Sequence, residues 1–222
     1  MNKNRVAVIG AAAVAALALA ACSSNDQAST GAATTSATAP APAGASTSAP
    51  MAQGVTTNAD VFGPACGMLP QGTAPGSLDS MGPQPVASAA STNPLLTKLV
   101  AAVKATNLVD PLNSSPSITV FAPADDAFAA LGDAKFQELA SKPDTLAPIL
   151  KYHVLGKRYD AKGLEAAKMA DTLDTDGGQL KFEGTGDNLT VNGAKILCGN
   201  IPTANATVFV IDKVLTPGTN KN

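Results

Sequence analysis

The stretch Thr119-Val-Phe-Ala-Pro-Ala-Asp-Asp-Ala-Phe128 brings two kinds of local structure together within ten residues. Its first half belongs to residues 117–122, a β-branched and aromatic run bounded by prolines, which is typical of a strand. Its second half predicts a helix that begins at Asp125 or Asp126, because acidic residues lie ahead of the apolar Phe128 and Leu131. The stretch therefore predicts a strand that leads directly into a helix.

Further helices are predicted on both sides of this stretch by apolar residues at helical spacing. Residues 94–106 form an amphipathic pattern, and residues 136–140 mark a second, shorter one. A third pattern has apolar positions at i, i+3, i+4 and i+7, with a proline near its start. Its positions are Leu146, Ile149, Leu150 and His153.

After Gly156 the sequence mostly predicts strands. Residues 171–175 and 179–183 flank Asp176-Gly177-Gly178, and residues 189–191 and 194–197 flank Asn192-Gly193, which is a strong hairpin pattern. Residues 207–211 are apolar on both faces, which indicates a buried strand. Early helices and late strands favour an α+β domain, and about 140 residues are enough for a single core.

Composition excludes several classes of function. The 222-residue chain has a formal charge of −2, whereas a nucleic-acid-binding protein usually carries a strong basic excess. Its single histidine and three cysteines are too few for a histidine-rich metal site or a four-cysteine zinc site. We therefore expect no nucleic-acid partner, no metal and no cofactor.

The N-terminus has the pattern of an export signal. Lys3 and Arg5 precede an unbroken run of apolar or small residues at 6–21, which is shorter than the roughly 20 apolar residues that a membrane-spanning helix needs. The run ends in Leu19-Ala20-Ala21-Cys22, which resembles the bacterial lipobox. That resemblance implies removal of residues 1–21, diacylation of Cys22 and attachment to the outer face of a membrane. The alternative is an ordinary signal peptide with an incidental cysteine.

Residues 22–59 are predicted to form a lipidated, disordered tether. In residues 23–50, 25 of 28 are Ala, Ser, Thr, Pro or Gly, and Asp26 is the only charge. Such a segment lacks the apolar residues needed to offset the entropy of ordering, and as a flexible coil it spans about 30 Å. Four threonines are candidates for O-glycosylation, and an unmodified spacer is the equal alternative. They are Thr34, Thr35, Thr38 and Thr47.

Two cysteines remain after the lipobox, Cys66 and Cys198. An exported chain meets an oxidising environment, so we predict a disulfide bond between them, with two buried free thiols as the alternative. The bond would attach an N-terminal extension, residues 60–84, to the rest of the domain.

Three motifs, in order, resemble the signatures of fasciclin domains. They are the opening stretch at 119–128, Tyr152-His153-Val154, and Asn205-Ala-Thr-Val-Phe-Val-Ile-Asp-Lys-Val-Leu-Thr-Pro217. The resemblance covers residues 85–217, leaves a short tail at 218–222, and departs at Ala124, where many members carry Thr. Residues 62–67 and Cys198-Gly199 further resemble the secreted and lipid-anchored fasciclin antigens of mycobacteria. The fold implied is a β-wedge with helices packed along it.

The resemblance implies a role in cell adhesion or recognition of a host or matrix surface, without catalysis. In the family, a central tyrosine and histidine and an acidic residue near the second signature are proposed receptor contacts, which gives Tyr152, His153 and Asp212 here. The alternatives are that His153 is hydrogen-bonded in the core, and that Asp212 is a solvent-facing or capping residue at the end of its strand.

Other functions are compatible with parts of the sequence. An enzyme would have to use His153, which lies on an apolar helical face, and no nucleophile elbow or phosphate-binding loop occurs. Residues 172–183 match part of a calcium-binding loop, but Thr172 stands where the first Asp ligand belongs, and a hairpin fits better. A lipid or small-ligand carrier is the main alternative to adhesion. We expect a cell-surface or matrix macromolecule as partner, a monomer, and a fraction of the protein shed from the membrane.

Overall fold

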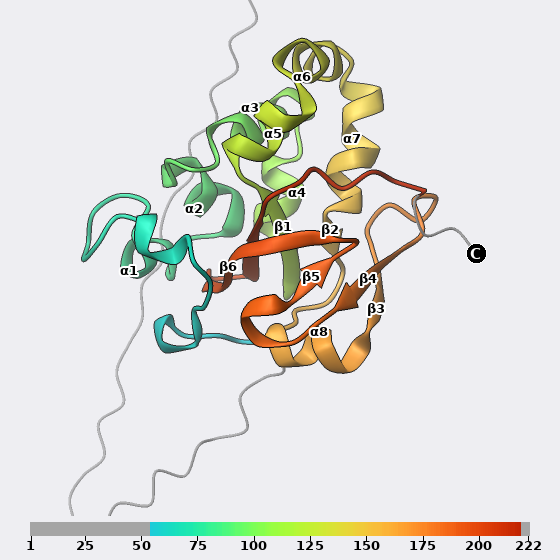
Figure 1. Cartoon of the computed structure of the whole chain (residues 1–222). Coiled ribbons are helices and arrows are strands. Elements are labelled where there is room, and N and C mark those ends of the chain that lie inside the picture. Colours follow the sequence, from blue (N-terminus) through green and yellow to red (C-terminus); the bar gives the residue numbers. More distant parts are fainter. Residues whose placement is uncertain (1–53, 219–222) are drawn as a thin grey trace, which may run out of the picture. The chain divides into compact units, whose positions relative to one another are not determined.

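The computed structural model describes residues 54–218 (Figure 1). The predicted signal peptide, the lipidation site Cys22 and the candidate glycosylation sites Thr34, Thr35, Thr38 and Thr47 lie outside the described residues. Within residues 54–218, none of the helices has the length and apolar character that crossing a membrane requires.

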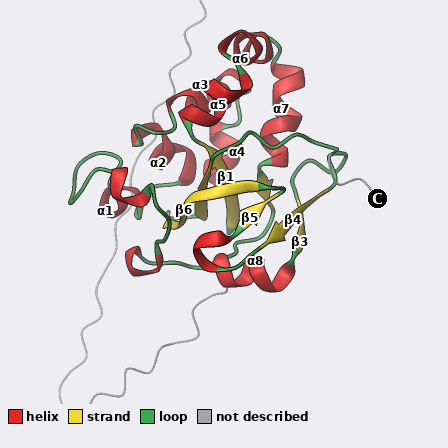
Figure 2. Cartoon of the chain, in the orientation of Figure 1, coloured by secondary structure: helices red, strands yellow, loops and turns green. Residues whose placement is uncertain are grey.

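Helices dominate the first half of the described chain. The α-helices are α1 (Leu78–Met81), α2 (Val86–Thr92), α3 (Thr97–Ala105), α4 (Val109–Ser114), α5 (Asp125–Leu131), α6 (Asp133–Ala140), α7 (Pro143–Tyr152) and α8 (Ala161–Ala167). Short 3₁₀ helices are η1 (Asn58–Asp60), η2 (Cys66–Met68) and η3 (Gly186–Asn188). In Figure 2, α2 to α7 lie above the strands and α8 lies below them.

The strands form one mixed sheet of seven, in the order β2-β1-β7-β6-β5-β4-β3. They are β1 (Ile118–Pro123), β2 (Val154–Leu155), β3 (Met169–Asp171), β4 (Gln179–Glu183), β5 (Thr190–Val191), β6 (Ala194–Pro202) and β7 (Ala206–Ile211). A further bridge joins Leu155 of β2 to Thr172, which follows β3, and so connects the two edge strands of the sheet. The predicted α+β class is confirmed.

The two outer sequence motifs lie side by side in the centre of this sheet. β1 and β7 pair in parallel without a break, from Ile118 opposite Ala206 to Pro123 opposite Ile211. Every residue of both strands is buried, as expected for a parallel pair that is covered on both faces. The first and last signatures therefore form one central structural unit, although more than 80 residues separate their strands.

Alternate residues of the central strands face two hydrophobic layers. Ile118, Val120 and Val208 pack in a cluster with the helices, whereas Phe121 and Phe209 pack in a second cluster with β3–β6 and α8. The rings of Phe121 and Phe209 are stacked with centroids 5.5 Å apart. The period of two along each strand thus divides one apolar run between two cores.

The predicted hairpin across Asn192-Gly193 is confirmed, and the other is confirmed only in part. β3 pairs with β4 across the turn that contains Asp176-Gly177-Gly178, but β3 spans Met169–Asp171, so the strand predicted at residues 171–175 is wrong beyond Asp171. β5 pairs with β6 across Asn192 and Gly193, whose φ angles of 48° and 73° are the two positive values that a type I′ turn needs. Helices α1, α2, α4 and α8 were not predicted. Helix α8 begins where the Asp160 side chain accepts a hydrogen bond from the N–H of Gly163.

The disulfide bond between Cys66 and Cys198 is present in the structure, and it joins the N-terminal extension to β6. The folded part begins earlier than the predicted end of the tether at residue 59. Thr56 is buried, and the carbonyl of Gly54 accepts a hydrogen bond of 2.6 Å from the Thr207 hydroxyl of β7. Residues 54–59 therefore belong to the domain, because their backbone packs against the sheet.

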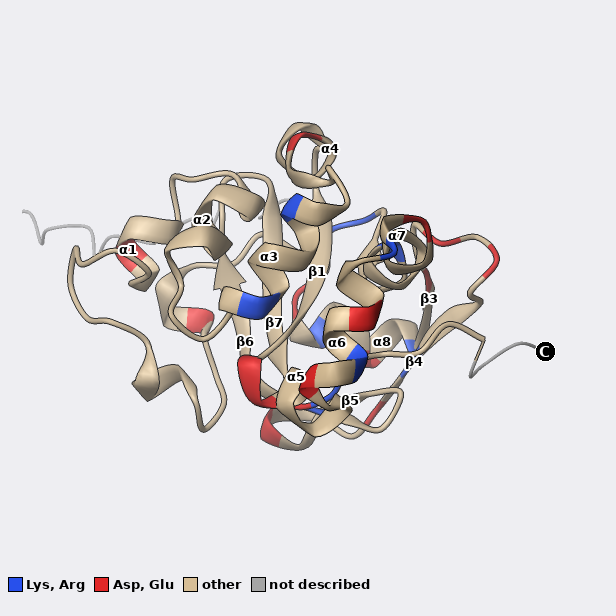
Figure 3. Ribbon diagram, turned by 90° about the horizontal axis from the view of Figure 1, so that it is seen from above, with Lys and Arg blue, Asp and Glu red and all other residues tan. Residues whose placement is uncertain are grey.

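Charged residues of both signs are mixed over the face that Figure 3 presents. Helix α6, for example, carries Asp133, Lys135 and Glu138 within its eight residues. Mixed charges of this kind keep a surface soluble without creating the strong field that a basic stripe would produce.

Candidate functional site

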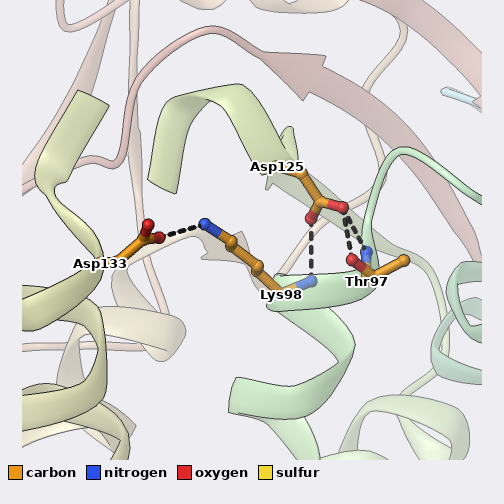
Figure 4. A network of polar contacts seen from close by, with 4 residues as sticks. All are labelled: Thr97, Lys98, Asp125 and Asp133. Atoms are coloured by element: carbon orange, nitrogen blue, oxygen red, sulfur yellow. Dashed lines mark hydrogen bonds and ion pairs between the residues drawn. The ribbon is translucent and has the colours of Figure 1, made fainter. Parts of the chain in front are cut away.

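The first signature places a carboxylate at the start of a distant helix. Asp125 accepts hydrogen bonds from the backbone N–H groups of Thr97 and Lys98 at 3.3 and 2.8 Å, and also from the Thr97 hydroxyl (Figure 4). Lys98 in turn reaches Asp133 of α6. Asp125 thus satisfies the free N–H groups at the start of α3 and joins α5 to α3.

His153 is a buried structural residue in this fold. Its ring is 2% exposed, its Nδ1 lies 2.8 Å from the carbonyl oxygen of Ile149, and its Nε2 accepts the backbone N–H of Leu215 at 2.9 Å. Because a carbonyl only accepts and an amide only donates, Nδ1 carries the proton and the ring is neutral. Burial lowers the pKa of His153 to about 4, although the hydrogen bond to Ile149 opposes this shift.

Tyr152 is completely buried and faces the second hydrophobic cluster. Its hydroxyl donates to the carbonyl of Gln179 at 3.3 Å and accepts from the side-chain amide of Asn192 at 3.0 Å. Tyr152 therefore joins α7 to β4 and to the turn between β5 and β6. Neither Tyr152 nor His153 is positioned to touch a partner directly, which corrects the expectation that their side chains form a receptor contact.

Asp212 lies at the end of β7 and is partly exposed. Its carboxylate accepts the backbone N–H of Lys195 at 2.7 Å, and its own N–H donates to the carbonyl of Lys195 at 3.1 Å. These bonds extend the pairing of β6 with β7 by one residue. Asp212 thus occupies the strand-end position that was the alternative to a receptor contact, and its side chain remains accessible from solvent.

A narrow apolar cavity lies between the helices and the sheet. It has a volume of about 40 Å³, and its walls include Val103, Leu112, Val120 and His153. A cavity of roughly 150 Å³ is needed to hold a molecule the size of benzene. The cavity in this conformation is therefore too small for a lipid chain.

Asn205, the first residue of the second signature, connects three segments. Its amide nitrogen donates to the carbonyls of Leu112 and Ser115 at 2.8 and 2.7 Å, and its amide oxygen accepts the N–H of Val86 at 2.9 Å. No local pattern in the sequence indicates this role of Asn205, because its hydrogen-bond partners lie about 90 to 119 residues earlier in the chain.

The fold and these motifs define a fasciclin domain. The family model described as "Fasciclin domain" matches residues 94–217, which is more than half of the chain. The chain belongs to the fasciclin family.

Curated relatives extend the similarity beyond the domain. The chain is 39% identical over 180 residues to "Immunogenic protein MPB70" of Mycobacterium bovis, which covers 78% of this chain and 88% of that protein. It is also 39% identical over 166 residues to "Cell surface glycolipoprotein MPB83" of the same species, covering 72% and 73% respectively. A 34% identical relative, "Protein sll1483" of Synechocystis, covers 60% of this chain and 73% of its own.

Among solved structures, the chain is similar to the FAS1 domain pair of the insect cell adhesion molecule Fasciclin I. That match has a TM-score of 0.46 and 19% sequence identity, and it covers 55% of this chain and 45% of the other.

Proposed function

We propose that this protein is a membrane-anchored surface lipoprotein that presents its fasciclin domain for adhesion to a cell surface or extracellular matrix. The observation that carries this proposal is the similarity of the domain and its N-terminal extension to a protein named as a cell surface glycolipoprotein. The lipobox-like Leu19-Ala20-Ala21-Cys22 supports the anchor independently, because it lies outside the domain that carries the family similarity.

The described domain suits a presenting role because it is tied together at many points. The disulfide, Asn205, Tyr152 and His153 each connect segments far apart in the sequence. A preorganised surface loses little conformational entropy when it binds a macromolecule. We infer that Tyr152 and His153 support adhesion by holding this surface in shape, while Asp212 remains a candidate contact.

The lipid anchor is tested by mass spectrometry of protein extracted from membranes. We expect the N-terminal peptide to begin at Cys22 and to carry the mass of its acyl chains. A Cys22→Ser variant should lack these chains and appear in the aqueous phase of a detergent partition. An N-terminus at another residue without acyl groups would contradict the anchor. The same peptide maps report whether Thr34, Thr35, Thr38 and Thr47 carry sugars.

Adhesion is tested with the full chain coated on beads and offered to collagen, fibronectin and cultured cells. We expect saturable binding to at least one of these surfaces and competition by the free protein. An Asp212→Asn variant retains an oxygen that can accept the Lys195 N–H, so it tests the charge of this side chain without removing the strand contact. Absence of binding to every surface would contradict the proposal.

A lipid carrier has less support, because the apolar cavity beside His153 has a volume of only about 40 Å³. Mass spectrometry of freshly purified, denatured protein distinguishes the two functions. Stoichiometric release of a lipid or other small molecule would favour the carrier.

A further inference from the structure

A larger hollow on the surface is lined by the N-terminal segment and by α8. Helix α8 lies on the lower side of the domain in Figure 1. Its volume is about 500 Å³, which lies within the range of small-ligand sites. The candidate contact residues Tyr152, His153 and Asp212 do not line it.

The two walls of the hollow are fixed by one buried side chain. Asn200 is 8% exposed and lies at an irregularity of β6, with a φ angle of 59°. Its amide nitrogen donates to the carbonyl of Asp60 at 3.0 Å, and its amide oxygen accepts the N–H of Ala161 at 2.9 Å. Because Asp60 belongs to the N-terminal segment and Ala161 begins α8, Asn200 connects the two parts of the chain that line the hollow.

Three anchored carboxylates line the hollow, and each uses one oxygen for the protein's own backbone. Asp60 accepts the N–H of Thr57 at 2.8 Å, Asp160 accepts from Gly163 at 2.8 Å, and Glu165 accepts from Gly186 at 2.7 Å. The second oxygen of each carboxylate makes no hydrogen bond to the part of the chain that the structure describes. The hollow therefore offers three acceptors whose positions are already fixed.

Thr56 supplies an independent indication of a ligand. Its side chain lines the hollow and is 6% exposed, yet its hydroxyl has no hydrogen-bond partner within residues 54–218. A buried hydroxyl without a partner costs free energy, so a native protein normally supplies one. A ligand that reaches Thr56 would provide the missing hydrogen bond.

The hollow also has an aromatic wall. The backbone of Phe62 pairs with Gly199 through two hydrogen bonds, at 2.8 and 3.3 Å, and its ring packs edge-on against Phe209 with centroids 6.5 Å apart. Lys162 on α8 lines the hollow as well and makes no ion pair with the described residues. The site thus combines fixed acceptors, one ammonium donor and an apolar ring.

We propose that this hollow binds a saccharide. Sugar hydroxyls donate to the free carboxylate oxygens and to Thr56, a ring or hydroxyl oxygen accepts from Lys162, and the apolar C–H face of the sugar packs on Phe62. Sugar binding itself is inferred from the hollow alone. Only the source of the sugar rests on the proposed function, since adhesion would supply a glycan on the surface that the protein contacts.

Other ligand classes fit the hollow less well. No group of three His, Cys, Asp or Glu side chains in residues 54–218 is arranged to hold a metal ion. An anionic ligand would be repelled by three carboxylates and a cationic ligand by the ammonium of Lys162, whereas a neutral ligand meets neither repulsion.

The proposal is tested by saturation-transfer NMR of the full chain in detergent with glucose, galactose, mannose and N-acetylglucosamine. We expect at least one of these sugars to give saturable transfer, strongest at the C–H protons that face Phe62. A Thr56→Val variant keeps the shape of the side chain and removes only its hydroxyl. We expect it to weaken binding about fivefold while leaving the melting temperature of the free protein unchanged or higher.

A Glu165→Gln variant retains an oxygen for the Gly186 N–H but removes the charge, and we expect it to weaken sugar binding as well. The matched control is Asp110→Asn, an exposed carboxylate on α4, which should bind sugars as the parent chain does. Absence of saturation transfer to every sugar would overturn the proposal. Sugar binding by Thr56→Val and Glu165→Gln that is as tight as binding by the parent chain would also overturn it. Binding of spermidine that Glu165→Gln abolishes, without sugar binding, would assign the hollow to a cation instead. None of these outcomes depends on adhesion to cells, so the two proposals fail separately.

Discussion

The backbone N–H of Leu215 donates a hydrogen bond of 2.9 Å to Nε2 of His153, 62 residues earlier in the chain. This bond attaches the segment after β7 to the C-terminal end of α7. It exists only while the ring is neutral, because protonation of Nε2 removes the acceptor. The central histidine of the fasciclin signature therefore acts here as a buried acceptor, and its titration is coupled to the packing of the C-terminal segment.

We predict that folding becomes less stable as the pH falls from 6.5 to about 4. The pKa of His153 lies near 4 in the folded state and near 6.5 when unfolded, so the unfolded state takes up more protons in this window. Above pH 6.5 this effect is absent, and between pH 6.5 and pH 4 it lowers the unfolding free energy progressively, by about 3 kcal/mol in total. The chain has one histidine, so its ring proton can be followed by NMR without ambiguity. A midpoint near pH 6.5 in the folded protein would contradict the prediction.

Asp125→Ala should destabilise the domain by about 1–3 kcal/mol, since it leaves the first N–H groups of α3 without their acceptor. Urea unfolding measures the loss. The neighbouring Asp126 is exposed, and Asp126→Ala is the matched control, for which we expect less than about 0.5 kcal/mol. Equal losses in the two variants would show that charge, rather than capping, determines the effect.

Asn205→Ala should lower the unfolding free energy by about 2–4 kcal/mol, because the change removes the donor to three carbonyls and the acceptor of the Val86 N–H. Thermal unfolding followed by circular dichroism measures this change. Asn188→Ala, at an exposed position in η3, is the comparison, and it should leave the melting temperature nearly unchanged. A small effect at Asn205 would mean that water replaces its side chain.

Replacing both Cys66 and Cys198 by serine should lower the unfolding free energy by about 2–5 kcal/mol, because the bond closes a separation of 132 residues. We also expect faster hydrogen exchange at residues 54–68, which the bond holds against β6. Reduction of the native protein provides the second measurement. If exchange in this segment stays slow after reduction, the hydrogen bonds of Phe62 and Asn200 suffice to hold it.

Gly199→Ala should destabilise the domain by at least about 1 kcal/mol, since a Cβ at this position would lie 2.4 Å from the Phe62 ring and 3.0 Å from that of Phe209. The Phe209 ring is fully buried in a packed layer and has little room to move, and the partly buried Phe62 ring would have to shift to admit the methyl group. Gly67→Ala is the matched control, because a Cβ there meets no atom within 4 Å. Chemical denaturation of the two variants measures the difference.

Local sequence patterns are enough to predict the α+β class, most element positions and the hairpin at Asn192-Gly193. These patterns are the β-branched and aromatic run at residues 117–122, the helical spacing in residues 146–153, and the Asn192-Gly193 pair, which accepts positive φ angles. The disulfide was predictable for a similar reason, because export left Cys66 and Cys198 as the only pair. Helices α1, α2, α4 and α8 were not predicted, since their four to seven residues are too few to show a clear period.

The roles of the signature residues depend on contacts that form only in the folded domain. The parallel pairing of β1 with β7 buries the first and last motifs, and the end of α7 directs Tyr152 and His153 into the interior. Burial, hydrogen-bond partners and pKa depend on segments that are distant in the sequence. For the same reason, no local pattern indicates the hollow beside Thr56, whose walls come from the N-terminal segment, β6 and α8 and meet only when the chain is folded.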